Sequence, residues 1–206
     1  MGVWLCRRQP TVVGGRVFVG SANGEVYSLD AATGCTHWVF KAEAAVRTAI
    51  SVGDGPRGWL LHFGDQRGNA YGVDALTGQP VWTTRVDTHA SALITGAPTL
   101  DDGVLYVPVS SSEEAAATEP SYSCCNFRGS VVALQANTGQ RLWQAFSIKA
   151  PAAPVRTDEP GAVHLGPAGA AVWSAPTVDR LAGRVVATTG NSYADPPSDG
   201  ADALLA

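Results

Sequence analysis

Four residues occupy the same place ahead of four similar strand starts, and together they could bind a flat anion. Each lies three residues before a Pro-Thr or Ile-Ser pair that opens a short apolar run: Arg7, Arg47, Thr95 and Trp173. Arginine pairs with carboxylates through two parallel hydrogen bonds, and an indole offers a face for stacking. If the runs that follow are the innermost strands of a radial fold, these side chains converge on its axis. They would suit a planar polycarboxylate there.

Two adjacent cysteines, Cys124 and Cys125, are the next candidates for chemistry. Adjacent cysteines can close a strained eight-membered ring that is more reducible than an ordinary disulfide, but two buried reduced thiols are the alternative. The remaining cysteines are Cys6 and Cys35, and none of the four has the spacing of a zinc site or a CxxCH haem attachment.

The remaining ionisable residues suggest structural roles. Glu113 and Glu114 are adjacent in a polar, acidic stretch, which is more typical of a solvated loop than of a catalytic pair. The histidines have no spacing suited to a metal pair or triad, and we expect them to be structural or exposed: His37, His62, His89 and His164.

A repeat defines the elements that must position these residues. Three windows of equal length share a Gly at the fifth position, an alternating strand, a Thr-Gly turn and a closing Trp: Gly20–Trp38, Gly64–Trp82 and Cys125–Trp143. This pattern predicts a hairpin in which the turn glycine has a positive φ. The tryptophans Trp38, Trp82 and Trp143 should be structural, each donating its indole N–H to a carbonyl of a neighbouring repeat.

A second strand pair precedes each hairpin, so that each unit has four strands. Four-stranded units at this spacing predict an all-β fold, a β-propeller of four-stranded antiparallel blades, of which about three or four are present. We expect the blades at residues 10–40, 48–84, 96–145 and 172–206. Two insertions interrupt them, at residues 110–123 and 148–167, and the second shows no strand pattern. Function is expected to concentrate in such loops.

Composition excludes several classes of function. The chain has 206 residues, 45% of them hydrophobic, and a formal net charge of -4, so it lacks the basic field that a nucleic-acid partner requires. Its longest apolar stretches, such as residues 103–109, are far shorter than the roughly 18 residues of a membrane span. Residues 1–12 contain no apolar core of a signal peptide.

The tails that read LDAATGCTHW and GVDALTGQPVW resemble the tryptophan-docking repeat of pyrroloquinoline quinone (PQQ) dehydrogenases. The runs PVSSSEEAAATEPSYSCCNFRGSVVAL, GPAGAAVWSAPTVD and TTGNSYADPPS are similar to the polyvinyl-alcohol dehydrogenase branch of that family. The resemblance implies an eight-bladed propeller that holds PQQ and calcium, oxidises alcohols and passes electrons to cytochrome c in the periplasm. It also implies that this chain is a fragment, inactive alone, whose general-base aspartate lies beyond Ala206.

The resemblance also assigns roles to individual residues. Trp173 would form the floor beneath the quinone, and Asn191, in the Gly-Asn after the next strand, would be a calcium ligand. The other expected cofactor-binding residues are Arg47, Thr95, Cys124, Cys125 and Arg128. Related alcohol dehydrogenases carry an acidic calcium ligand a few residues before the Arg-Gly pair, at the place where this chain has Cys124.

One alternative function comes from a different class of protein. A non-catalytic propeller scaffold, such as an outer-membrane assembly lipoprotein, shares this repeat and uses its rims to bind protein partners. The Cys-Cys pair, the VWSAPTVD strand and the Thr-Gly-Asn turn favour the enzyme.

Overall fold

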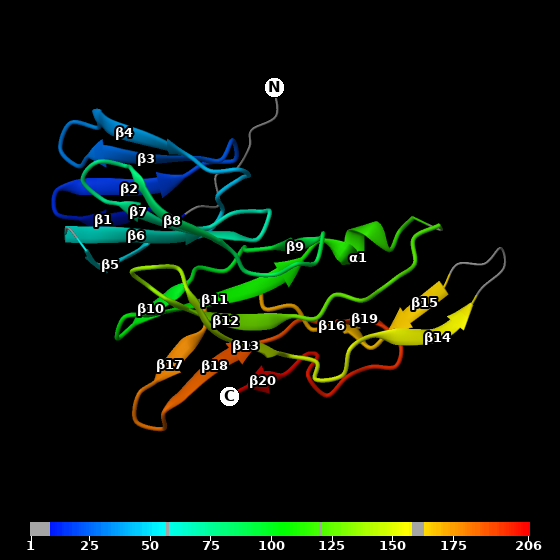
Figure 1. Ribbon diagram of the computed structural model, residues 1–206. Coiled ribbons are helices and arrows are strands. Elements are labelled where there is room, and N and C mark those ends of the chain that lie inside the picture. The colour runs from blue at the N-terminus through cyan, green and yellow to red at the C-terminus, as the bar shows by residue number, and fades with distance from the viewer. Residues whose placement is uncertain (1–8, 57, 120, 158–162) are drawn as a thin grey trace.

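The computed structural model describes residues 9–56, 58–119, 121–157 and 163–206, so the candidate Arg7 and the cysteine Cys6 lie outside the described residues. Consecutive antiparallel sheets follow one another along the chain (Figure 1). The first contains β1 (Thr11–Val13), β2 (Arg16–Gly20), β3 (Glu25–Asp30) and β4 (Thr36–Lys41). The second contains β5 (Ser51–Gly55), β6 (Gly58–Gly64), β7 (Asn69–Asp74) and β8 (Pro80–Arg85).

The third and fourth sheets continue this order. The third contains β10 (Thr99–Asp101), β11 (Val104–Ser111), β12 (Ser130–Gln135) and β13 (Arg141–Phe146), with β9 (Ala92–Leu93) paired to the far end of β11. The fourth contains β17 (Thr177–Asp179), β18 (Arg184–Thr188) and β20 (Leu204–Leu205). These sheets are successive blades of a partial β-propeller.

A repeated hydrogen bond connects the first strands of the four blades. In each case a hydroxyl on one first strand donates, at 2.6 Å, to a carbonyl at the start of the next first strand. The pairs are Thr11 to Ile50, Ser51 to Pro98 and Thr99 to Pro176. The first strands therefore lie side by side as the inner edge of the propeller, with the residues just before them near its hub.

The tryptophans connect the outer parts of the blades. The indole N–H of Trp38 donates to the carbonyl of Ala75 at 3.2 Å, and that of Trp82 to the carbonyl of Ala136 at 2.8 Å, as predicted. Trp143 differs, because 41% of it is exposed and its indole N–H has no hydrogen-bond acceptor among the described residues.

The turn glycine of each following blade lies beneath these rings. A Cβ at Gly78 would lie 2.7 Å from the Trp38 ring, and one at Gly139 would lie 2.5 Å from the Trp82 ring. Both glycines have φ near +70°. The Thr-Gly turn therefore serves two functions: it permits the left-handed backbone and leaves room for the tryptophan of the preceding blade.

Apolar residues fill the space between the blades. One core cluster lies between the first and second blades and includes Phe18, Phe63 and Tyr71. A second cluster lies between the second and third blades and includes Leu60, Val107 and Leu134. Both are buried from solvent and fix the angular spacing of neighbouring sheets.

The segment 148–167 corrects the expectation that it carries no strand. It contains the antiparallel pair β14 (Ala153–Thr157) and β15 (Val163–Gly166), and a further pair joins β16 (Ala168–Gly169) to β19 (Ser192–Ala194). The first insertion contains one short helix, α1 (Glu113–Ala116). Figure 1 shows α1 and the β14–β15 hairpin at the same end of the sheets. Among the described residues, no helix has the length and hydropathy needed to cross a bilayer.

Candidate functional site

The structure brings together the segments that contain two of the predicted hub residues, Thr95 and Trp173. A Cβ on Gly96, which follows Thr95, would lie 2.8 Å from the carbonyl oxygen of Trp173, so the two segments are in van der Waals contact. The Thr95 hydroxyl lies 3.1 Å from that of Ser110 on β11. Arg47 occupies the corresponding place before β5 and is exposed.

Trp173 lies against the Gly-Asn turn that the sequence singled out. A Cβ on Gly190 would lie 2.9 Å from the Trp173 indole nitrogen, so glycine is needed for this close approach. Two backbone hydrogen bonds fix the turn, from Gly190 to the carbonyl of Ala171 and from Ala170 to the carbonyl of Asn191. Trp173 is 42% exposed.

The side chain of Asn191 contacts a carboxylate that the sequence analysis did not select. Its amide nitrogen lies 3.1 Å from Oε1 of Glu114 on α1, across 77 residues of sequence. Trp173, Gly190, Asn191 and Glu114 therefore form one connected stretch of the surface. No spacing rule could have identified this pair, because the two residues lie on different blades.

Cys124 and Cys125 form a disulfide, which decides between the two alternatives left by the sequence. The backbone of the pair is bonded to β15, because Cys125 N–H donates to the carbonyl of Leu165 at 3.1 Å and Leu165 N–H donates to that of Cys124 at 2.7 Å. Cys125 Sγ lies 3.9 Å from the Tyr193 carbonyl oxygen. The disulfide thus lies between the two insertions and close to β19.

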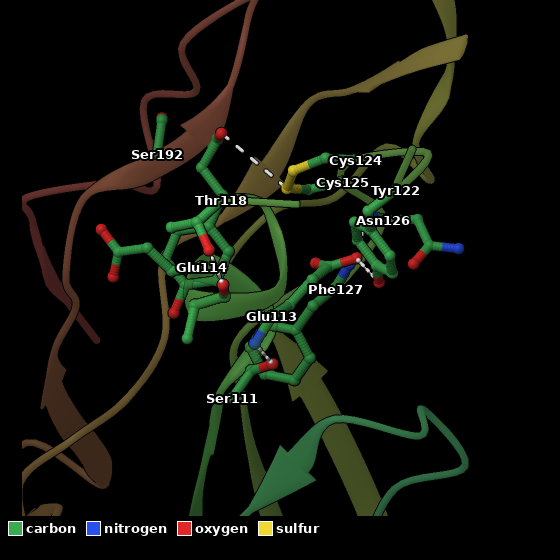
Figure 2. The surroundings of a disulfide bond; sticks show 12 residues. Ser111, Glu113, Glu114, Thr118, Tyr122, Cys124, Cys125, Asn126, Phe127 and Ser192 are labelled. Atoms are coloured by element: carbon green, nitrogen blue, oxygen red, sulfur yellow. Dashed lines mark hydrogen bonds between the residues drawn. A yellow bond between two sulfur atoms is a disulfide. The ribbon is translucent and has the colours of Figure 1, made fainter. Parts of the chain in front are cut away.

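Glu113 is fully buried beside the disulfide, so the expectation of a solvated loop was wrong for this residue. Its Oε1 accepts hydrogen bonds from Asn126 N–H at 2.9 Å and Tyr122 O–H at 3.0 Å, and its Oε2 accepts one from Phe127 N–H at 2.8 Å (Figure 2). These donors lie on both sides of Cys124–Cys125. The carboxylate therefore fastens both ends of the disulfide loop, and we call this group of contacts the Glu113 clamp.

His89 completes the Glu113 clamp. In the neutral imidazole, Nδ1 accepts the backbone N–H of Ser91 at 3.1 Å and the proton is on Nε2. Nε2 lies 2.7 Å from the side-chain oxygen of Asn126 and 3.5 Å from Glu113 Oε1. The hydrogen bond toward Glu113 raises the pKa of His89, against the effect of burial. Burial acts to raise the pKa of Glu113, but its bonds with His89, Asn126, Phe127 and Tyr122 hold that pKa below its ordinary value.

Tyr193 contributes an aromatic wall that no sequence motif indicated. Its ring stacks on that of Phe127, with centroids 6.4 Å apart and an interplanar angle of 23°. Its hydroxyl is buried and has no hydrogen-bond partner among the described residues. Burial raises the pKa of this phenol, and the nearby carboxylates of Glu114 and Glu113 raise it further.

Arg128 lies next to this region, but its side chain is turned away from it. Its guanidinium lies 4.0 Å from the centroid of the Phe146 ring and donates to the carbonyls of Ile148 and Lys149. These contacts connect β13 with the start of the second insertion. The Arg128 guanidinium is thus bound at the start of the second insertion, whereas Trp173, Gly190, Asn191 and Glu114 form the connected stretch described above.

Comparison with known proteins agrees with this architecture. The family model PQQ_2, described as outer membrane protein assembly factor BamB, matches residues 5–196. Two curated relatives named polyvinylalcohol dehydrogenase, from Pseudomonas sp. and Sphingopyxis sp. (strain 113P3), are 42% and 41% identical over 202 residues. These matches cover 96% of this chain but only 32% and 31% of the relatives.

Solved structures support the propeller fold. Quinohemoprotein alcohol dehydrogenase ADHIIG from Pseudomonas putida HK5 aligns with a TM-score of 0.70 at 21% identity, covering 95% of this chain and 31% of that one. The quinohemoprotein alcohol dehydrogenase from Comamonas testosteroni aligns with a TM-score of 0.65, also at 21% identity, covering 91% of this chain and 29% of that one.

Proposed function

We propose, on the premise that this chain belongs to the PQQ_2 family, that it forms part of a PQQ-dependent alcohol dehydrogenase of the polyvinyl-alcohol type. The observation that carries the proposal is the contact of Trp173 with the Gly190–Asn191 turn, and of Asn191 with Glu114, beside the Cys124–Cys125 disulfide. The identity of 42% to a polyvinylalcohol dehydrogenase supports the same reaction class.

The exposed indole fits a flat cofactor. PQQ is a planar tricarboxylate, and the Trp173 ring presents a stacking face near the hub. Arg47 and Thr95 are the proposed polar partners of its carboxylates, and the Cys124–Cys125 ring is the proposed cover on the opposite side. We do not include Arg128, because its guanidinium is bonded to the Phe146 side of the blade.

The donor set also fits calcium. Calcium prefers carboxylate and amide oxygens, and the Asn191 amide already lies 3.1 Å from a Glu114 carboxylate oxygen. Rotating this amide would direct its oxygen toward the carboxylate, an arrangement that a cation between them stabilises. No group of three or more His, Cys, Asp or Glu in the described ranges could hold a metal alone. Asn191 and Glu114 would therefore be the contribution of this chain to a calcium site.

The residues of this chain have distinct tasks in this function. When bound, PQQ takes up the electrons of the alcohol, and calcium acts as a Lewis acid toward its carbonyl. Trp173 supports the ring, Asn191 and Glu114 fix the cation, and the Glu113 clamp holds the disulfide loop in place. We propose cytochrome c as the electron acceptor and the periplasm as the compartment, since a structural disulfide persists in an oxidising environment.

A dye-reduction assay tests the proposal. The full-length protein, loaded with PQQ and calcium, should reduce an artificial electron acceptor when a secondary alcohol is added, and should lose this activity when PQQ is left out. A folded, PQQ-loaded protein that reduces no dye with any alcohol would contradict the proposal.

A non-catalytic scaffold is the second candidate function, because the matching family model is described as an assembly factor. Such a scaffold needs no binding site at its hub. A titration with PQQ separates the two functions: the dehydrogenase should show saturable quenching of tryptophan fluorescence, and the scaffold should not.

A further inference from the structure

A pocket of about 400 Å³ lies next to the disulfide, with Cys124 in its wall. Its walls come from Cys124, from the β14–β15 hairpin and from β19. The lining residues are Cys124, Val155, Arg156, His164, Tyr193, Ala194 and Asp195. Because the hairpin belongs to the second insertion, this pocket is not part of the repeated blade.

The pocket adjoins the proposed quinone site. Cys124 lines the pocket and belongs to the disulfide proposed as the cover of the quinone, and Tyr193, which also lines the pocket, follows Asn191 by two positions in the sequence. A long substrate oxidised near Trp173 would therefore extend across the disulfide into this pocket.

The chemistry of the walls favours a neutral, hydroxyl-rich chain. Arg156 and His164 are register partners in the β14–β15 pair, and Asp195, directly after β19, contributes a carboxylate. Side chains of opposite charge disfavour a ligand of strong net charge, whereas both kinds hydrogen-bond to hydroxyls. Val155, which is half exposed, and Ala194 add apolar surface between these polar groups.

We propose that this pocket is a binding subsite for a polymeric alcohol in which methylene and hydroxymethine groups alternate. The apolar surface contacts the carbon chain, and Arg156, His164 and Asp195 bind hydroxyls distant from the reacting carbon. This proposal rests on the proposed function. It extends that function, because the subsite would let the enzyme bind a polymeric alcohol more tightly than a small one.

Filling the pocket tests this subsite. In the full-length protein loaded with PQQ and calcium, Ala194→Phe should lower kcat/KM for poly(vinyl alcohol) by about tenfold, mainly through a higher KM, because remote binding energy is lost. The value for isopropanol, which is too small to reach the pocket, should stay within about twofold. Ala153→Phe is the matched control, because it adds the same ring on β14 without lining the pocket, and should change neither value.

A second variant keeps the proposal testable if Ala194→Phe does not fold. Arg156→Gln removes a charge at an exposed position and should raise KM for the polymer alone. The subsite is overturned if Ala194→Phe and Arg156→Gln leave the polymer kinetics unchanged, or if polymer and isopropanol lose activity equally. If the unmodified protein oxidises neither alcohol, the proposed function fails and the subsite fails with it.

Discussion

The contact between the second and third blades differs in kind from the inserted loop at residues 112–128. At the blade contact, one buried indole N–H meets one carbonyl, and the glycine of the next repeat makes room for the ring. In the loop, one buried carboxylate accepts three hydrogen bonds and has a histidine beside it. The repeated residues stack the blades, whereas the buried carboxylate of Glu113 fastens a loop that interrupts the repeat.

The largest expected effect comes from removing a docked tryptophan. Trp82→Ala should lower the free energy of unfolding by about 3–5 kcal/mol, because it empties a buried site and removes the indole hydrogen bond to the Ala136 carbonyl, which then keeps only its contact with His62 Nε2. Trp143→Ala should cost about 1 kcal/mol, since this ring is 41% exposed. Urea denaturation of the 206-residue chain measures both changes, and equal losses would contradict the assigned difference between these blade contacts.

Breaking the Glu113 clamp should have the next largest effect. Glu113→Ala should cost about 2–4 kcal/mol, because it leaves the buried N–H of Phe127 and the partly buried N–H of Asn126 without their acceptor. Glu114→Ala, on the exposed side of the same short helix, is the control and should cost less than about 0.5 kcal/mol. If the two losses are the same, the loop does not depend on the buried carboxylate.

The clamp also predicts a pH dependence of stability. The pKa of Glu113 is lowered in the folded state, so its contribution is present above the ordinary value of 4.5 and is lost as the pH falls through the folded pKa. The pKa of His89 is raised, so its contribution is present below 6.5 and is lost as the pH rises through the folded value. The cost of Glu113→Gln, measured by urea denaturation, should therefore be greatest between these limits and shrink in acid. A cost that does not vary with pH would exclude a charged clamp.

Replacing the turn glycines by alanine should lower stability by different amounts, depending on whether a tryptophan ring of the preceding blade lies against the glycine. This difference should be smaller than the effects above. Gly139→Ala should cost about 2–3 kcal/mol, because it combines a positive φ with a clash against Trp82. Gly34→Ala has the same backbone strain, but nothing lies within 4 Å of the added Cβ, so it should cost about 1 kcal/mol. Thermal unfolding of both variants measures the difference, which should shrink in a Trp82→Ala background, where only the Thr84 hydroxyl, 2.7 Å from the added Cβ, still opposes it.

The smallest expected effect concerns the third turn. In the first two blades Asp30 and Asp74 accept hydrogen bonds from the following turn, whereas the third blade has Gln135 in this position. Gln135→Asp should supply the missing acceptor and raise stability by about 0.5 kcal/mol. A loss of stability in denaturant would show that this turn does not share the geometry of the other two.

The sequence was sufficient to predict the fold because its repeat encodes contacts with neighbours at a fixed period. The Thr-Gly turn and the Trp of the preceding blade appear in every window, and the structure places Gly78 and Gly139 beneath Trp38 and Trp82. The inner-edge position of Trp173 followed from the same register. Trp143 shows the limit of this reasoning, since a repeated residue does not guarantee a repeated contact.

The site was only partly predictable because its contacts cross the repeats at no fixed spacing. Glu113 and Glu114 are adjacent in sequence, yet one is fully buried under the disulfide loop and the other contacts Asn191 on another blade. The β14–β15 hairpin pairs strands that show no alternating pattern, with β14 largely exposed. Tyr193 has no motif of its own and is identified only by its contact with Phe127.

The most direct test of the proposed quinone site is the affinity of the calcium-loaded, full-length protein for PQQ, followed by quenching of its tryptophan fluorescence. The account predicts saturable binding that Trp173→Ala weakens by about tenfold or more, through the loss of ring stacking. Trp59→Ala, at an equally exposed indole away from the hub, should leave binding unchanged. Saturable binding that is the same in all three proteins, or no binding at all, would contradict the account.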